Sequence, residues 1–190
     1  MFLEAVILAL VIGWLRGGRL KRLLSYDLKG LNCILFALSV RYLIQFLSWR
    51  MDFFLVYGGI IQISAYIILF WGLWQSLEFL EIKMVGLGSL ANFVVIAANG
   101  GKMPVSPSAV DSLGLTLTET GTHVLMGEGT RFFWLADIIP LPPPYPFPMV
   151  ISVGDILIVL GVMLLIQNAM LRDTRPTGLQ NDTANWLRRV

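Results

Sequence analysis

Apolar residues fall in long blocks along the chain, and short polar segments separate these blocks. A helical block of about 20 apolar residues matches the ~30 Å hydrocarbon core of a bilayer. A helix also satisfies its own backbone hydrogen bonds where no water is present. The pattern therefore predicts an all-α membrane protein, a bundle of five transmembrane helices. The predicted spans are 2–15, 31–49, 53–77, 84–98 and 150–171, within a transmembrane domain of residues 1–171 that precedes a polar cytosolic tail, 172–190.

Composition agrees with this pattern. Hydrophobic residues make up 56% of the chain and charged residues only 14%, whereas a soluble domain carries about a quarter charged residues. The net charge of +2 gives no reason to expect a nucleic-acid partner, so the expected partner is the lipid bilayer. The single cysteine, Cys33, lies in an apolar block and has no second cysteine with which to form a disulfide.

The distribution of Lys and Arg predicts the orientation, because basic residues concentrate on the cytoplasmic side of a membrane. One side holds most of them: Arg16, Arg19, Lys21, Arg22, Lys29, Lys83, Arg172, Arg175, Arg188 and Arg189. The other side holds Arg50, Lys102 and Arg131. We therefore expect an N-terminus outside, a C-terminus inside and a long external loop, 99–149. No basic residue precedes the first apolar run, which favours a retained span over a cleaved signal peptide in a bacterial multi-pass plasma-membrane protein.

The external loop opens with a helix stop, because Asn99 is followed by Gly100 and Gly101. Ser106 and Pro107 then match a helix N-cap and a first-turn proline, which predicts a short helix beyond them. Two interpretations of the stop remain open. The segment is either a simple exit turn or a break that lines a cavity below the outer surface, where non-helical backbone needs protein or water beside it.

Several polar residues interrupt the outer halves of the predicted spans. Asp155 lies a few residues inside the fifth span, where a carboxylate is either functional or a first-turn aspartate stabilised by the helix dipole. Arg41 needs a partner or must reach the surface, and Asp155 is the natural candidate for an ion pair. Gln45 and Gln62 occupy similar depths and complete a set of candidate binding or cavity-lining residues.

A second aspartate, Asp137, interrupts an apolar run before the proline-rich segment 140–148, which we expect to be stiff and extended. His123 has no second histidine or cysteine near it, so we expect a solvated loop residue and no metal site. No Ser-His, Cys-His or phosphate-loop arrangement is present, and nothing in the sequence indicates a cofactor.

Three segments together resemble an uncharacterised family of small bacterial polytopic membrane proteins, a domain of unknown function. They are Asn99-Gly-Gly-Lys-Met-Pro-Val105, Leu135-Ala-Asp-Ile-Ile-Pro140 and Ser152-Val-Gly-Asp155. This resemblance covers most of the chain and implies a membrane protein without implying an activity.

The C-terminal third is also similar to lipoprotein signal peptidase, the type II signal peptidase. The similarity rests on residues 135–139 around Asp137, residues 151–155 ending in Asp155, and residues 88–92 ending in Asn92. It implies that Asp137 and Asp155 are a catalytic dyad that meets at the outer surface. Two adjacent carboxyls share one proton, so one activates water while the other protonates the scissile carbonyl of a membrane-anchored substrate.

Three functions therefore remain open. The first is a non-enzymatic membrane component, a binding or assembly protein whose polar residues pack the bundle and whose partners are other membrane proteins. The second is the aspartyl peptidase-like enzyme with its Asp137 and Asp155 dyad. The third is a small transporter subunit, in which Arg41 and Asp155 mark a pathway that five spans form only as an oligomer.

Overall fold

The computed structural model describes residues 2–48, 50–116 and 120–172 of the chain. Its helices are α1 (Phe2–Leu15), α2 (Leu20–Leu24), α3 (Leu31–Leu47), α4 (Asp52–Trp74), α5 (Leu80–Ala98), α6 (Pro107–Ser112), α7 (Val153–Leu171) and a short 3-10 helix (Phe133–Leu135). The strands are β1 (Met103–Val105), β2 (His123–Leu125), β3 (Ile139–Leu141) and β4 (Met149–Ile151). Except for Arg172, the predicted tail lies outside the described residues.

The long helices follow the predicted apolar segments, with two informative differences. Helix α5 begins at Leu80 rather than at residue 84, because its charged first turn is accommodated by α7: the Asn168 side chain donates a 2.6 Å hydrogen bond to Glu81. Helix α7 begins at Val153 rather than at residue 150, because the preceding residues pair as strand β4.

Helices α4, α5 and α7 are long and apolar enough to cross a membrane, whereas α1 and α3 are shorter apolar helices. Length and composition thus support three membrane spans directly. They do not by themselves make α1 and α3 membrane spans.

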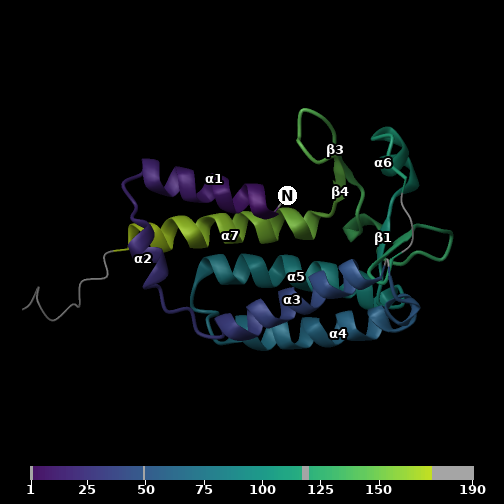
Figure 1. Cartoon of the computed structure of the whole chain (residues 1–190), viewed down its shortest axis with the longest axis horizontal. Coiled ribbons are helices and arrows are strands. Elements are labelled where there is room, and N and C mark those ends of the chain that lie inside the picture. The colour runs from purple at the N-terminus through teal and green to yellow at the C-terminus, as the bar shows by residue number, and fades with distance from the viewer. Residues whose placement is uncertain (1, 49, 117–119, 173–190) are drawn as a thin grey trace, which may run out of the picture.

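The long helices form layers in the order α1, α7, α5, then α3 and α4 (Figure 1). Glycines allow the central pair to approach closely. A Cβ atom on Gly154 of α7 would lie 2.7 Å from the carbonyl oxygen of Gly88 on α5, and one on Gly161 would lie 2.8 Å from that of Glu81. Small residues at helix contacts are a common packing solution in membranes, where close backbone approach replaces the hydrophobic effect.

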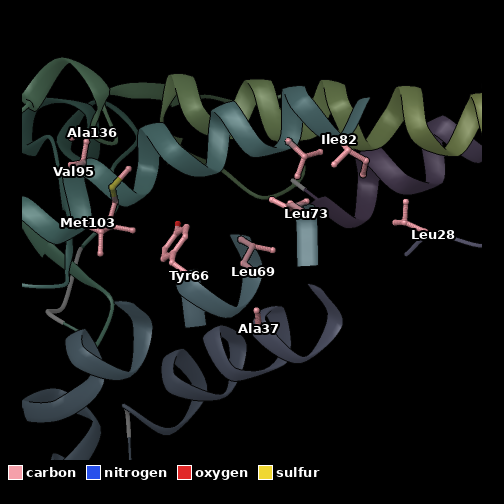
Figure 2. Close-up of a cluster of buried hydrophobic side chains, with 11 residues drawn as sticks. Leu28, Ala37, Tyr66, Leu69, Leu73, Ile82, Val95, Met103 and Ala136 are labelled. Carbon is pink, nitrogen blue, oxygen red and sulfur yellow. The ribbon is translucent and has the colours of Figure 1, made fainter. Parts of the chain in front are cut away.

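The main core lies where α4 and α5 meet, with α3, α7 and part of the loop region packed around them. Figure 2 shows Tyr66 and Leu69 of α4 in this core, with Met103 of β1 beside Tyr66. Large apolar side chains are exposed on the outer faces of the helices, among them Phe46, Ile60 and Trp71. Such faces suit a lipid environment.

The segment predicted as an external loop is an ordered cap, which we define as residues 99–152 without 117–119, at one end of the helices (Figure 1). Strand β1 pairs with β2 in parallel, and β3 pairs with β4 as an antiparallel hairpin. Asp137 forms a parallel bridge to Val105 of β1. The fold is therefore not all-α as predicted, because these three-residue strands satisfy their backbone groups by pairing inside the cap.

The predicted short helix is confirmed as α6. Ser106 is its N-cap and accepts a 3.4 Å hydrogen bond from the Ala109 amide, and Pro107 occupies the first turn.

Candidate functional site

Asp155 belongs to a capping box at the start of α7. The Ser152 hydroxyl accepts a 3.0 Å hydrogen bond from the Asp155 amide, and the Ser152 amide donates to Asp155 Oδ2 at 3.1 Å. This arrangement satisfies backbone donors that the first turn of a helix leaves free. Asp155 is thus a first-turn aspartate, as one of the two interpretations proposed, and it does not lie deeper inside the helix.

Asn92 of α5 completes this network across the α5–α7 contact. Its Nδ2 donates a 2.9 Å hydrogen bond to Asp155 Oδ1, and its Oδ1 accepts a 2.9 Å hydrogen bond from the Ser152 hydroxyl. Asn92 and Ser152 are both buried. Sequence similarity to the peptidase pointed to Asn92 and Asp155 separately, and the structure places them in direct contact.

Asp137 lies in the cap, where its backbone is fixed on both sides by the segment around β1. Its amide donates to the Pro104 carbonyl at 3.1 Å, and its carbonyl accepts from the Ser106 amide at 2.9 Å. The side chain is 8% exposed, and its Oδ1 has no hydrogen-bond partner among the described residues. Its Oδ2 lies 3.8 Å from His123 Nε2, which is too long for a hydrogen bond.

Burial governs the ionisation of this pair. It raises the pKa of Asp137 well above its usual range, and the negative charge of Asp155 raises it further, while Arg41 acts in the opposite direction. Burial and then the positive charge of Arg41 lower the pKa of His123 to about 4. The His123 imidazole is therefore neutral near neutral pH, and burial favours the protonated form of Asp137.

His123 differs from the solvated loop histidine expected from the sequence. Its side chain is only 30% exposed, and its Nε2 lies 3.8 Å from the buried Asp137 carboxyl, while its backbone belongs to strand β2, which pairs with β1. The Thr122 hydroxyl lies 2.9 Å from the Nδ1 atom. Within the part of the chain that the structure describes, no group of three His, Cys, Asp or Glu residues could hold a metal ion.

The predicted ion pair between Arg41 and Asp155 is wrong, since no such contact forms between these described residues. The Arg41 guanidinium lies over the ring of Tyr66 instead, 4.6 Å from the centroid, a favourable cation–π geometry. Both Asp155 oxygens already accept hydrogen bonds from α5 and from the capping box. The two charges nevertheless occupy one region, because both act electrostatically on His123 and Asp137.

The two predicted glutamines face different surroundings. Gln62 of α4 is buried, and its Oε1 has no partner among the described residues; the same holds for the hydroxyl of Tyr66, one helical turn further along. Gln45 of α3 is exposed and lies one turn beyond Arg41 on the same helix.

Asn99, Gly100 and Gly101 form the turn that connects α5 to the cap. Both glycines adopt the left-handed conformation, with φ of 70° and 82°, which other residues rarely adopt. The Asn99 side chain binds the backbone of Arg131 in the loop. Its Nδ2 donates to the Arg131 carbonyl and its Oδ1 accepts from the Arg131 amide, each at 2.9 Å. These contacts support the exit-turn interpretation for Asn99.

Sequence analysis missed Ser152, Tyr66 and His123 as members of the site. The Ser-Val-Gly-Asp pattern before an apolar run is a capping-box signal, so Ser152 could have been found. Tyr66 carries no local signal because it is one of many aromatic residues in an apolar block. His123 depends on the pairing of β1 with β2, which the sequence does not reveal.

The fold and site together define a helical protein of the membrane type, with a buried polar cluster beneath a small cap. The sequence of residues 25–167 matches the family described as "Family of unknown function (DUF5317)", and the chain belongs to this family. It is 27% identical over 186 residues to a Thermotoga maritima protein described as "Uncharacterized protein", covering 96% of this chain and 100% of that protein. No solved structure matches the chain.

Membership of an uncharacterised family agrees with the first resemblance seen in the sequence. The similarity to lipoprotein signal peptidase stays a prediction.

Proposed function

We propose that this chain is a multi-pass protein of the bacterial plasma membrane in which α1, α3, α4, α5 and α7 all cross the bilayer. Helices α1 and α3 have 14 and 17 residues, or roughly 21 and 26 Å at about 1.5 Å per residue. Both are apolar, and they pack against α7 and α4 respectively. A short span beside longer ones is accommodated by local bilayer thinning.

The cap lies outside in this proposal, because the basic residues concentrate at the opposite end of the helices. Cysteine labelling tests it in cells. A membrane-impermeant maleimide should label Ser112→Cys in intact cells and Ser25→Cys only after permeabilisation. Labelling of Ser25→Cys from outside would overturn the orientation.

Its proposed role is non-enzymatic: a binding or assembly component whose polar residues hold the cap and helices in a fixed arrangement. The observation that carries this proposal is the network of Asn92, Ser152 and Asp155. Each of its side chains is used in hydrogen bonds that join α5 to the start of α7. Residues that serve structure in this way do not need a substrate to explain them. A double-mutant cycle on this network, worked out in the Discussion, tests the role.

An aspartyl peptidase-like activity is the second candidate, and the contrast between Asp137 and Asp155 favours it. Asp137 is buried, which raises its pKa and favours its protonated form, whereas the Asp155 carboxylate accepts hydrogen bonds from two elements. Environments that separate two carboxyls in this way suit an acid and a base. The protonated Asp137 would donate to a scissile carbonyl while Asp155 draws a proton from the attacking water.

Incubation with a diacylated lipopeptide in detergent tests this candidate by mass spectrometry of the products. The peptidase proposal requires a released lipid-bearing fragment, and it requires that Asp137→Asn and Asp155→Asn each abolish the release. Cleavage that persists in either variant would exclude the dyad.

A further inference from the structure

Three buried polar atoms in the region where α3, α4 and the cap meet have no hydrogen-bond partner among the described residues: Gln62 Oε1, the Tyr66 hydroxyl and Asp137 Oδ1. Tyr66 and Gln62 are 0% and 1% exposed, and Asp137 is 5% exposed. Leaving a buried polar group without a hydrogen-bond partner destabilises the folded protein. Native proteins leave few such groups without a partner, so three of them in one region indicate that something else binds there.

Arg41 adds an unpaired charge to the same region. Its guanidinium is half-buried, faces the Tyr66 ring and lies close to the Tyr66 hydroxyl, and it forms no ion pair with the carboxylates that the structure describes. A cation in the hydrocarbon region is costly unless an anion or a strong acceptor compensates it. The ring face supplies only part of that compensation, since a cation–π contact is worth about 0.5–2 kcal/mol.

These groups lie in the region where α3, α4 and the cap meet. Arg41, Asp137 and Asp155 all act electrostatically on the Tyr66 hydroxyl. Gln62 precedes Tyr66 by one turn and lies on the same face of α4. Tyr66 lies beside Met103, the first residue of β1, and therefore directly beneath the cap (Figure 2).

We propose that Arg41, Tyr66, Gln62 and Asp137 form a binding site for an oxyanion, the carboxylate or phosphate group of a small molecule or lipid. Arg41 supplies the charge and several donors in a planar fork that matches such groups. The Tyr66 hydroxyl adds a neutral donor, and Gln62 adds another through its amide nitrogen Nε2, since its Oε1 only accepts.

Asp137 acts as a donor in this site when its carboxyl is protonated, the form that its burial favours by raising its pKa. The charged and titratable groups facing the site are Arg41 of α3, Tyr66 of α4, His123 of β2 and Asp155 of α7. Asp155 opposes anion binding, but hydrogen bonds and the α7 N-terminus already stabilise its charge. Water alone would satisfy the neutral atoms and leave Arg41 without a counter-ion.

This inference rests on the proposed binding role and names its ligand class. The test uses the full chain purified in an uncharged detergent. Inorganic phosphate is titrated at constant ionic strength, balanced with chloride, while thermal unfolding is followed. In parallel, the protein is placed in nanodiscs of phosphatidylcholine with or without phosphatidylglycerol, and bound lipid is measured by native mass spectrometry.

We expect stabilisation by phosphate, retention of phosphatidylglycerol, or both. Phosphate alone identifies a free oxyanion, and phosphatidylglycerol alone identifies a lipid headgroup. Arg41→Gln should weaken binding at least tenfold, about the effect of losing a charge-assisted contact of ~1.4 kcal/mol. Arg50→Gln, an exposed arginine near the same end, is the matched control and should bind normally.

Two gentler variants keep the test decisive if Arg41→Gln fails to fold. Tyr66→Phe removes only a hydroxyl and should weaken binding severalfold. Wild-type affinity should fall as pH rises through the raised pKa of Asp137, and Asp137→Asn, which still donates, should bind without that dependence. Wild-type protein that binds neither probe, or Tyr66→Phe with unchanged affinity, would refute the site. The cysteine-labelling pattern would then still decide the membrane topology separately.

Discussion

Replacing Ser152 by alanine should destabilise the protein more than its size suggests, because this hydroxyl serves two partners. Loss of a serine N-cap costs about 1 kcal/mol. The same change leaves the buried Asn92 Oδ1 without its 2.9 Å donor, which costs a further ~1–3 kcal/mol. The expected decrease in the free energy of unfolding is therefore about 2–4 kcal/mol.

Reversible unfolding by SDS in detergent micelles, followed by circular dichroism, measures this effect. Ser39→Ala is a matched control. That serine is exposed, and its hydroxyl donates only to the Leu35 carbonyl of its own helix, at 2.8 Å. A surface change of this kind should stay within about 0.5 kcal/mol.

The double change with Asn92→Ala isolates the bond itself. Both single changes break the same contact, and the double variant leaves no orphaned Asn92 oxygen, so the losses should fall short of additive by about 1–3 kcal/mol. Additive losses, or a Ser152→Ala effect no larger than that of Ser39→Ala, would show that the network does not hold α5 to α7.

Two further predictions concern packing and pH. Gly161→Ala should lower stability by about 1–3 kcal/mol, because its Cβ would lie 2.8 Å from the Glu81 carbonyl oxygen and from Val85 Cγ2. Gly127→Ala is the control: its Cβ would have nothing within 4 Å, so it should be neutral in the same SDS titration. His123 has its pKa lowered to about 4, so its contribution to stability is lost as pH falls from about 6.5 to 4. Wild type should lose on the order of 2 kcal/mol more than His123→Gln across that window, and parallel pH profiles for the two proteins would contradict the burial argument.

The helices of this chain and their N-caps could be predicted from the sequence because they depend on neighbouring residues. Long apolar blocks indicate membrane-type helices, and Ser106 before Pro107 marks the start of α6. The strands of the cap are different. Each has three residues, too few for a period-2 pattern, and each depends on a partner distant in sequence, as β1 depends on β2 and Asp137 depends on Val105.

The burial of several polar residues was easier to predict from the sequence than the contacts that they make with one another. Of the polar residues singled out in the sequence, Asp137, Asn92 and Gln62 are buried, whereas Gln45 is exposed. Charge complementarity then suggested Arg41 with Asp155, but local geometry decided otherwise. The capping box and Asn92 together occupy both carboxylate oxygens of Asp155, and the Arg41 guanidinium packs over the ring of Tyr66 instead.

The two aspartates should respond oppositely to the same isosteric change, which separates a packing role from a catalytic one. Asp155→Asn removes the charge that accepts hydrogen bonds from Asn92 and Ser152 beside a helix N-terminus, so it should lower stability by about 1–3 kcal/mol.

Asp137→Asn should instead raise stability near neutral pH. The raised pKa means that the folded protein holds a proton that the unfolded chain has already released above pH ~4. This proton-uptake cost makes wild-type stability fall with rising pH, by up to about 1.4 kcal/mol per unit until the raised pKa is reached, and asparagine has no such cost. The measurement is SDS unfolding of wild type and both variants between pH 5 and pH 8. Over about this range the free energy of unfolding should depend on pH differently in wild type and in Asp137→Asn. Equal destabilisation by both changes would mean that Asp137 is held as a structural carboxylate. Opposite signs would leave Asp137 as a protonated, structurally costly group, which only binding or chemistry explains.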